Sequence, residues 1–226
     1  MNVLIFDSGT LITLTIAGLE EILPALKKKT DIVFLLTPAV KYEVIKRPIQ
    51  TKKFALSALK LKNLLDKGII DSPSVLKIDQ DNLDSLTSEI MNKVNKTFWA
   101  RERPMNLIQK GESSCLALYQ ILEKDKRIKK VAIAVDERTT RMLGEKPENL
   151  HKLLEKKLHT KIQVKGNLNQ FKKYNFIRSA ELVYIAYKKG IIDLKNGNVL
   201  DSLLYATKFA GCSISKEEIN EIKKLK

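Results

Sequence analysis

VLIFDSGTLI, residues 3–12, places an aspartate at the end of an apolar run, followed by three small or turn-forming residues. A short apolar run that stops at a turn signal predicts a buried strand. The stretch KKVAIAVDE, residues 129–137, repeats this arrangement, so that Asp136 follows its strand as Asp7 follows the first one. Ligands bind at the carboxyl ends of the strands in open parallel sheets, and the two acids can therefore face one crevice.

Segments with strand-like and helix-like patterns alternate along the chain, which predicts an α/β fold around a mainly parallel sheet. Thr37 and Pro38 follow the second strand and form a suitable N-cap and first helical turn. We expect strands at residues 2–6, 31–37 and 129–135, and helices at residues 11–26, 39–47, 54–68, 111–125, 179–193, 199–211 and 215–226.

Two parts of the chain carry a weaker pattern than the rest. The section 71–110 is expected to contain a short strand at 75–78, a helix at 81–96 and an irregular arm at 97–106. Residues 145–173 are rich in lysine, and we expect a helix of their own and an edge strand at 161–165. A chain of 226 residues can bury one sizeable core. We therefore predict one domain, 1–226, with extended segments near 77–110 and 145–173.

The charge of the chain favours a polyanionic partner. Lys and Arg outnumber Asp and Glu by 41 to 26, a formal charge of +15, which favours nucleic acid or an anionic surface. The apolar runs are much shorter than the roughly 20 residues that a membrane-spanning helix needs. No basic region precedes the first strand, as it would in a secretory signal. We expect a cytoplasmic protein that does not enter a membrane.

Cysteine and histidine offer little for catalysis in this sequence. Cys115 and Cys212 lie among apolar residues without zinc-type spacing, and we interpret both as core thiols. His151 and His159 lie in a lysine-rich helical stretch, where a solvent-facing position is expected. Serine-hydrolase and zinc-hydrolase chemistry therefore lacks an obvious base or ligand set.

Two glutamates join the two strand-end aspartates as candidates for a site. Glu43 lies beside the apolar stripe of its predicted helix, and Glu112 shares a helix face with Cys115. Each acid also has a structural alternative: the aspartates as caps, and Glu112 as a partner of the helix dipole, an effect of about 0.3–1 kcal/mol.

Four carboxylates in one crevice would raise one another's pKa, and a divalent cation would remove this conflict. Oxygen ligands without histidine or thiolate favour Mg²⁺ or Mn²⁺. Such an ion activates water and polarises a phosphodiester, so that neither histidine nor an activated serine is needed.

Together, several stretches resemble the PIN-domain nucleases: VLIFDSGTLI (3–12), TPAVKYEVI (37–45), KGESSCLALY (110–119) and VAIAVDERTTRML (131–143). SAELVYIAYKKGIIDL, residues 179–194, resembles the C-terminal helix of one prokaryotic branch of that family. The resemblance implies a three-layer α/β/α sandwich around a mainly parallel sheet. It also implies an endoribonuclease that uses Mg²⁺ or Mn²⁺ to hydrolyse single-stranded RNA. Carried over by position, the catalytic and metal-binding residues are Asp7, Glu43, Glu112 and Asp136.

The resemblance also suggests supporting residues. Ser8 would bond a metal-bound water or hold its loop. Glu137 would be a further acid or a solvated helix start, and Arg141 would orient the acids, contact phosphate or form a surface ion pair. Candidate RNA-binding residues are Trp99, Arg101, Arg103, Lys46 and Arg47. Trp99 would stack on a base or, alternatively, anchor its arm to the core.

Several alternatives remain open at this level. The expected partner is single-stranded or structured RNA, and the role is either RNA maturation or that of a toxin with an antitoxin-like inhibitor protein. A homodimer is a further expectation from the resemblance. The chain could instead be a non-catalytic RNA-binding or scaffold protein. A phosphatase of the haloacid-dehalogenase type requires an aspartate two residues after Asp7, where Gly9 stands.

Overall fold

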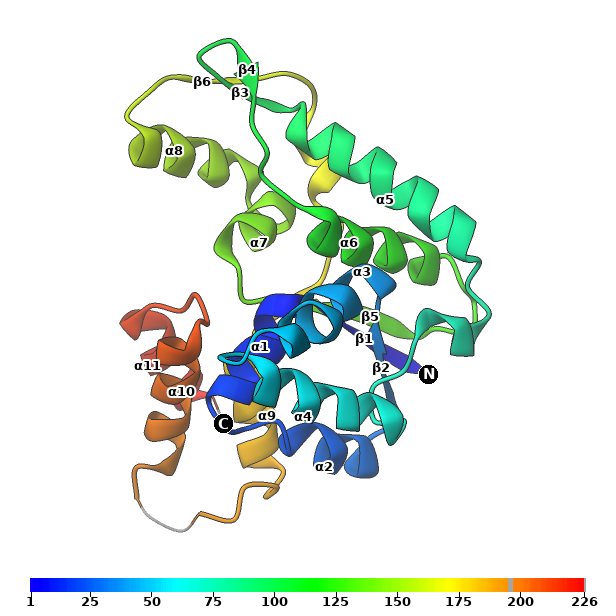
Figure 1. Ribbon diagram of the computed structural model, residues 1–226. Coiled ribbons are helices and arrows are strands. Elements are labelled where there is room, and N and C mark those ends of the chain that lie inside the picture. Colours follow the sequence, from blue (N-terminus) through cyan, green and yellow to red (C-terminus); the bar gives the residue numbers. More distant parts are fainter. Residues whose placement is uncertain (195–196, 226) are drawn as a thin grey trace.

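A sheet of four parallel strands, in the order β2-β1-β5-β7, forms the centre of the protein. The computed structural model describes residues 1–194 and 197–225 (Figure 1). The strands are β1 (Asn2–Phe6), β2 (Ile32–Leu36), β5 (Lys130–Ala134) and β7 (Phe176–Ile177). Asp71, which lies outside the named strands, forms a parallel bridge with Leu35 of β2. The expected α/β fold with a mainly parallel sheet is confirmed.

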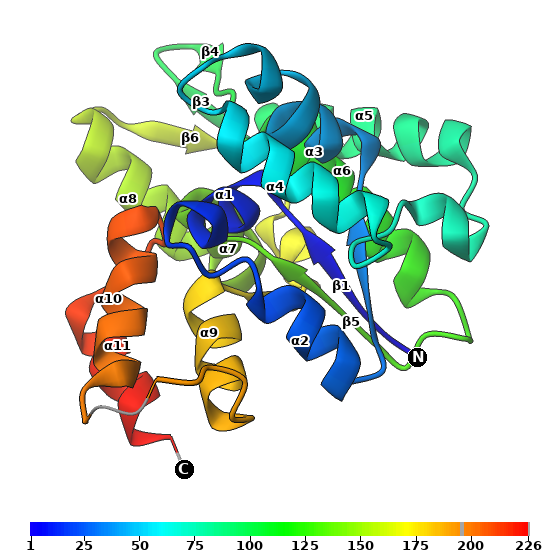
Figure 2. The same cartoon turned by 60° about the horizontal axis from the view of Figure 1, so that its bottom comes forward.

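Helices lie on both faces of this sheet, an arrangement compatible with three layers. Figures 1 and 2 show α6 on one face and α2 and α9 on the other. The helices are α1 (Ser8–Ile16), α2 (Ile22–Lys29), α3 (Pro38–Lys41), α4 (Ala55–Asp66), α5 (Gln80–Asn95), α6 (Lys110–Glu123), α7 (Arg138–Glu145), α8 (Pro147–Leu158), α9 (Ser179–Lys188), α10 (Val199–Ala210) and α11 (Lys216–Lys224). Among the described residues, no helix is both long and apolar enough to cross a membrane.

The core forms because the strands are apolar on both faces, as expected for parallel strands that are covered on both sides. Ile5 and Phe6 are fully buried, and the Phe6 and Phe34 rings meet edge to face at 5.5 Å between centroids. A smaller apolar cluster joins α9, α10 and α11 through residues that include Ala180, Leu204 and Ile219. Cys115 and Cys212 are both buried free thiols, as predicted.

Three expectations about local structure were wrong. The single helix expected at 11–26 is two helices, because the chain reverses at Gly18, whose φ of 69° suits glycine. Residues 75–78 do not form a strand. Pro73 begins a short 3-10 helix, Pro73–Leu76, which buries Leu76 in the core.

The prediction of an irregular arm at 97–106 was also wrong. This segment folds into a hairpin of β3 (Phe98–Ala100) and β4 (Arg103–Pro104). Arg101 and Glu102 turn the chain with positive φ angles of 48° and 62°, as a type I′ turn requires. β6 (Ile162–Val164) pairs antiparallel with β3, which confirms the expected edge strand. The two extended segments therefore build one small sheet together (Figure 1, top).

Candidate functional site

Asp7 occupies the carboxyl end of the central strand. Its backbone amide continues the ladder by donating to the Ala134 carbonyl at 2.9 Å. Its side chain caps α1, because Oδ2 accepts a hydrogen bond from the Gly9 amide at 3.1 Å. The residue is only 2% exposed, and Oδ1 has no hydrogen-bond partner within the described chain. The capping alternative is therefore realised, but it leaves one buried carboxylate oxygen available.

Glu43 reaches the same region from a π-helical turn, Tyr42–Lys46. Such wide turns are frequent at functional sites. The side chain of Ser8 and the backbone of Gly111 favour the charged form of the Glu43 carboxylate and lower its pKa. A Cβ atom added at Gly111 would lie 2.5 Å from Glu43 Oε2, so glycine allows the carboxylate to approach the start of α6.

Glu112 lies in the first turn of α6. Its Oε2 accepts a hydrogen bond from the Gln109 amide at 3.0 Å and completes a capping box. The structural alternative for Glu112, an interaction with the helix start, is thus present. A further buried contact, 2.7 Å between the Thr37 and Ser114 hydroxyl oxygens, joins the start of α3 to α6. Sequence reasoning identified neither Ser114 nor Gly111, because small residues in a helix start carry no distinctive pattern.

The electrostatics show that these three acids influence one another. Burial, together with the negative charges of Glu112 and Glu43, raises the pKa of Asp7 to about 7, against the lowering effect of the Gly9 and Ser8 amides. Burial also raises the pKa of Glu43, and the Glu112 charge adds to this effect, whereas the hydrogen bond from Ser8 opposes it. Three carboxylates from β1, the turn after α3, and α6 therefore share one electrostatic environment.

Asp136 is close to Asp7 but is held differently. A Cβ atom at Gly9 would lie 3.3 Å from Asp7 Oδ2 and 3.9 Å from the Asp136 Cβ. Asp136 Oδ1 accepts a hydrogen bond from the Ser179 amide at 2.8 Å, at the start of α9. Its Oδ2 is buried and unpartnered within residues 1–194 and 197–225. Like Asp7, Asp136 acts as a cap with one oxygen and keeps the other available.

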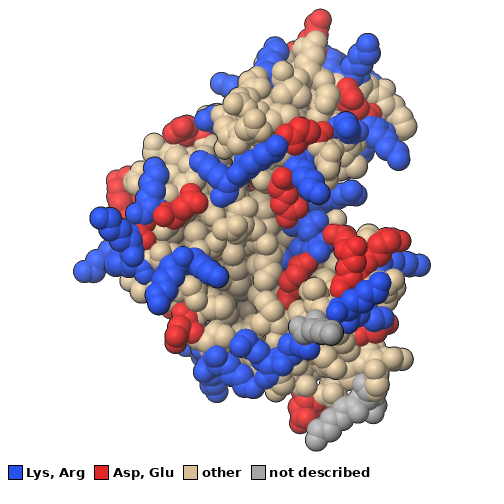
Figure 3. All heavy atoms as spheres, turned by 180° about the vertical axis from the view of Figure 1, so that it is seen from behind, with Lys and Arg blue, Asp and Glu red and all other residues tan. Residues whose placement is uncertain are grey.

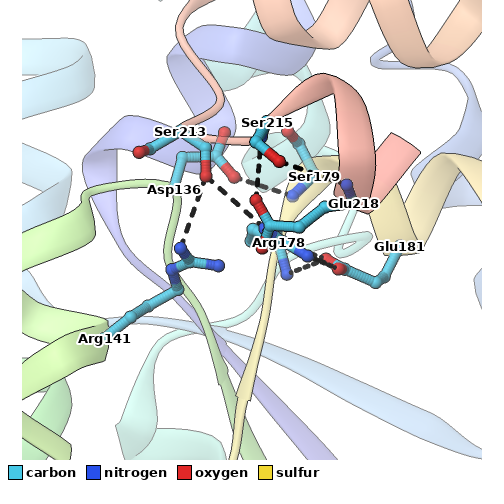
Figure 4. Close-up of polar contacts among 8 residues, drawn as sticks. All are labelled: Asp136, Arg141, Arg178, Ser179, Glu181, Ser213, Ser215 and Glu218. Carbon is cyan, nitrogen blue, oxygen red and sulfur yellow. Dashed lines mark hydrogen bonds and ion pairs between the residues drawn. The ribbon is translucent and has the colours of Figure 1, made fainter. Parts of the chain in front are cut away.

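A polar network ties the C-terminal segment to the strand end that carries Asp136 (Figure 4). The Asp136 carbonyl accepts from the Ser213 amide at 3.2 Å, and the Ser213 carbonyl accepts from Arg141 at 3.3 Å and from Arg178 at 3.5 Å. Arg178 also pairs with Glu181 of α9 and with Glu218 of α11, the latter at 2.6 Å. Sequence reasoning missed Arg178, although an arginine three residues before Glu181 at a helix start is a readable signal.

The structure also resolves the roles of two supporting residues. The expectation of a surface ion pair for Arg141 was wrong, because its side chain is buried and directed toward the Ser213 carbonyl. Glu137 accepts a hydrogen bond from the Thr140 amide at 2.7 Å and caps α7. The interpretation of Glu137 as a helix start therefore describes what the structure shows.

The candidate RNA-binding residues fall into two groups. Trp99 lies in β3, donates from Nε1 to the Lys96 carbonyl at 2.7 Å, and carries the Lys165 ammonium 3.3 Å from its ring centroid. Arg101 and Arg103 are exposed on the β3–β4 hairpin.

Lys46 and Arg47 are exposed at the end of the turn that carries Glu43. Tyr42 of this turn is 57% exposed, and sequence reasoning missed this aromatic ring beside the acids. One face of the Trp99 ring is covered, whereas Tyr42 is open.

The donor set suits a hard cation, although the carboxylates are not assembled around one. In the described parts of the chain, no three Asp, Glu, His or Cys side chains are already grouped so that they could hold a metal ion. Glu112 and Asp136 are directed into helix caps, which explains the incomplete grouping. Asp7 Oδ1 and Asp136 Oδ2 nevertheless provide buried oxygens without partners among these residues, and such oxygens are the ligands that Mg²⁺ and Mn²⁺ prefer.

Comparisons with protein-family models, with curated proteins and with solved structures found no match to this chain.

Proposed function

We propose that this protein is a metal-dependent endoribonuclease with a PIN-like fold that hydrolyses phosphodiester bonds of single-stranded RNA. The observation that carries the proposal is the crowding of carboxylates at the carboxyl end of the sheet, where burial and neighbouring acids raise the pKa of Asp7 to about 7. A purely structural site gains nothing from this repulsion. A divalent cation would remove this repulsion, because the same negative charges would then attract the cation.

Each of the four acids has a role in this proposal. Asp7, Glu43, Glu112 and Asp136 would hold Mg²⁺ or Mn²⁺. A bound divalent cation lowers the pKa of a coordinated water and neutralises charge on the phosphodiester. The Gly9 amide fixes Asp7 Oδ2, and the Ser179 amide fixes Asp136 Oδ1. Each aspartate is thereby oriented through one oxygen while the other stays available.

The chain's other residues would keep the site in shape. The absence of a side chain at Gly111 leaves room for the Glu43 carboxylate, and the Thr37–Ser114 contact holds the preceding helix against α6. Support of this kind limits the number of side-chain orientations that have to be restricted when a ligand binds.

Water as the nucleophile predicts the ends of the products. His151 and His159 belong to α8 and its C-cap, whereas Asp7 caps α1 and Glu43 lies in the turn after α3. If the ribose hydroxyl takes no part, the products carry 5′-phosphate and 3′-hydroxyl ends. A cyclic 2′,3′-phosphate would indicate a different mechanism.

RNA binding would depend on the basic residues near the acids. Lys46 and Arg47 lie on the turn that carries Glu43, and Arg101 and Arg103 lie on the hairpin. Each phosphate contact with single-stranded RNA contributes a slope of about −0.7 to the dependence of log affinity on log salt. Trp99 supports the proposal less than these cations do, because Lys165 covers its ring.

The test is incubation with defined single-stranded RNAs in Mn²⁺, Mg²⁺ or EDTA. We expect cutting with either metal, none in EDTA, and loss of cutting in Asp7→Asn and Asp136→Asn. Asp66→Asn is the matched control, because Asp66 is exposed and, among the described residues, forms an ion pair only with Lys62 across one helical turn. Metal-dependent cutting that persists in Asp136→Asn would defeat the site assignment.

A non-catalytic RNA-binding or scaffold protein is a second candidate. It is favoured by the capping roles of Glu112 and Asp136, which give both acids a structural use. Thermal melting discriminates the two functions. An increase in melting temperature with Mn²⁺ that disappears in Asp7→Asn supports the nuclease, and indifference to Mn²⁺ supports the scaffold.

The biological role within the nuclease proposal is RNA maturation or that of a toxin. A toxin would have an antitoxin-like inhibitor protein that blocks the acidic crevice, and co-purification with such a protein would distinguish the roles. Hydrolysis of a small phosphate ester with RNA left intact would instead support the phosphatase alternative.

A further inference from the structure

The sheet carries a second hollow at the end away from the acids. A cavity of about 650 Å³ includes residues from the amino-terminal halves of β1, β2 and β5. Its apolar lining includes Leu4, Ala132 and Ile177 of the sheet, Leu26 of α2, and Leu182 and Ile185 of α9. This volume lies within the range of about 300–1,000 Å³ that is typical of small-molecule sites.

The cavity has a roof and an opening. The Lys29 ammonium of α2 donates to the carbonyl of Lys189, the C-cap of α9, at 2.8 Å and thereby links the two helices. β7 pairs only with Ile133 and Ala134, so the first residues of β5 lack a strand neighbour on that side. From behind, a hollow of uncharged atoms is visible, with Lys and Arg and also some Asp and Glu at its border (Figure 3).

Positive charge surrounds the opening. Lys129, Lys130 and Lys189 line the cavity and are exposed, and none of them pairs with a carboxylate within the described residues. Glu123 is the single acidic residue in the described lining. The lining thus combines an apolar interior with a cationic rim.

This combination of an apolar interior and a cationic rim disfavours a second copy of the chain as the occupant of the cavity. A symmetric contact between two copies would bring the same lysines face to face, at a cost in electrostatic repulsion. A ligand with an apolar chain and an anionic head group can pack its chain against the apolar interior and place its head group beside the lysines of the rim.

We propose that this cavity binds a single-chain fatty carboxylate, with the chain between the sheet and the α2–α9 roof and the carboxylate at the three lysines. Such a ligand buries apolar surface worth about 0.8 kcal/mol per CH₂ group. Its head group gains charge-assisted hydrogen bonds without displacing an existing ion pair. The site is separate from the proposed nuclease site and does not depend on it.

The test is calorimetric titration of the full chain with dodecanoate below its micelle concentration. Dodecyltrimethylammonium, with the same chain and the opposite head charge, is the matched probe. We expect one dodecanoate per chain and at least tenfold weaker binding of the cationic probe.

Two variants locate the ligand. Lys129→Ser, Lys130→Ser and Lys189→Ser combined should weaken dodecanoate binding at least fivefold, whereas Lys67→Ser, Lys156→Ser and Lys157→Ser combined should leave it unchanged. Ala132→Phe should fill the floor and abolish binding. The lysine variants alter only exposed side chains and are expected to fold. They therefore show whether dodecanoate binds at this cavity even if Ala132→Phe does not fold.

Three results would overturn the proposal. The first is no binding of dodecanoate, and the second is equal binding of both head groups that the lysine variants do not change. The third is a concentration-dependent dimer that Ala132→Phe dissociates, which would assign the cavity to a second copy of the chain.

Discussion

The buried carboxylate of Asp7 should make the protein less stable as pH rises. Its pKa is raised from 3.8 to about 7, so the native state holds a proton over a pH range in which the unfolded chain has lost it. Stability contributed by Asp7 is therefore complete below about pH 4 and is lost as pH rises through 7. The full change amounts to about 4 kcal/mol, because each pKa unit corresponds to 1.36 kcal/mol.

Asp7→Asn isolates this contribution, because asparagine cannot ionise and its oxygen can still accept from the Gly9 amide. The buried asparagine NH₂ costs about 1–3 kcal/mol if it finds no partner, but that cost does not vary with pH. We therefore expect the stability of Asp7→Asn relative to wild type to increase by about 2–3 kcal/mol between pH 5 and pH 8.5.

The assay is urea denaturation in EDTA at several pH values, with Asp66→Asn as the exposed control. For a chain of this length, 1 kcal/mol corresponds to about 2–4 °C in melting temperature, so thermal scans provide a second measurement. A difference between Asp7→Asn and wild type that stays constant with pH would refute the reasoning, because Asp7 would then ionise as an ordinary carboxylate.

Three further changes test other parts of the structure. Gly111→Ala should displace the Glu43 carboxylate and lower RNA cleavage at least tenfold. The melting temperature should stay the same or rise, because alanine favours a helix over glycine by about 0.5–1 kcal/mol. Full cleavage activity in Gly111→Ala would contradict the role given to Glu43. Arg178→Met should destabilise the fold by about 1–3 kcal/mol and speed hydrogen exchange in α11, because it removes the ion pairs with Glu181 and Glu218; unchanged exchange would count against it. Burial, with the nearby charge of Asp136, raises the pKa of Cys212 to about 12, and burial also raises the pKa of Cys115. A thiol reagent at pH 8 should therefore label both cysteines only when urea unfolds the protein. Rapid labelling of the native protein would contradict the burial of these thiols.

The strands and their terminal acids were predictable because their signals are local. β1 and β5 are uninterrupted apolar runs, and an acid directly after each run has to lie at the carboxyl end of the sheet. The Thr37 cap was equally readable, and its hydroxyl accepts from the Val40 amide at 3.3 Å. Local periodicity cannot show that the turn carrying Glu43 is π-helical, and that geometry helps to set the direction of the side chain.

The pairing of the small sheet could not be predicted, although one of its strands was, because the strands come from distant segments and contain two or three residues each. Phe98 pairs with Val164, and nothing in either short stretch specifies the other. The hairpin turn contains Arg101 and Glu102, without the asparagine or glycine that usually marks a type I′ turn. The burial of Asp136 likewise depends on the C-terminal segment around Ser213, far away in the sequence.

Calorimetric titration with Mn²⁺ at pH 7, repeated in buffers of different ionisation enthalpy, tests the shared carboxylate site most directly. With the pKa of Asp7 at about 7, roughly half of the Asp7 carboxyls carry a proton before Mn²⁺ binds. We predict saturable Mn²⁺ binding with release of about half a proton per chain from Asp7, and loss of both in Asp7→Asn but not in Asp66→Asn. No Mn²⁺ binding, or the same binding and proton release in Asp7→Asn, would contradict a cation site built on these acids.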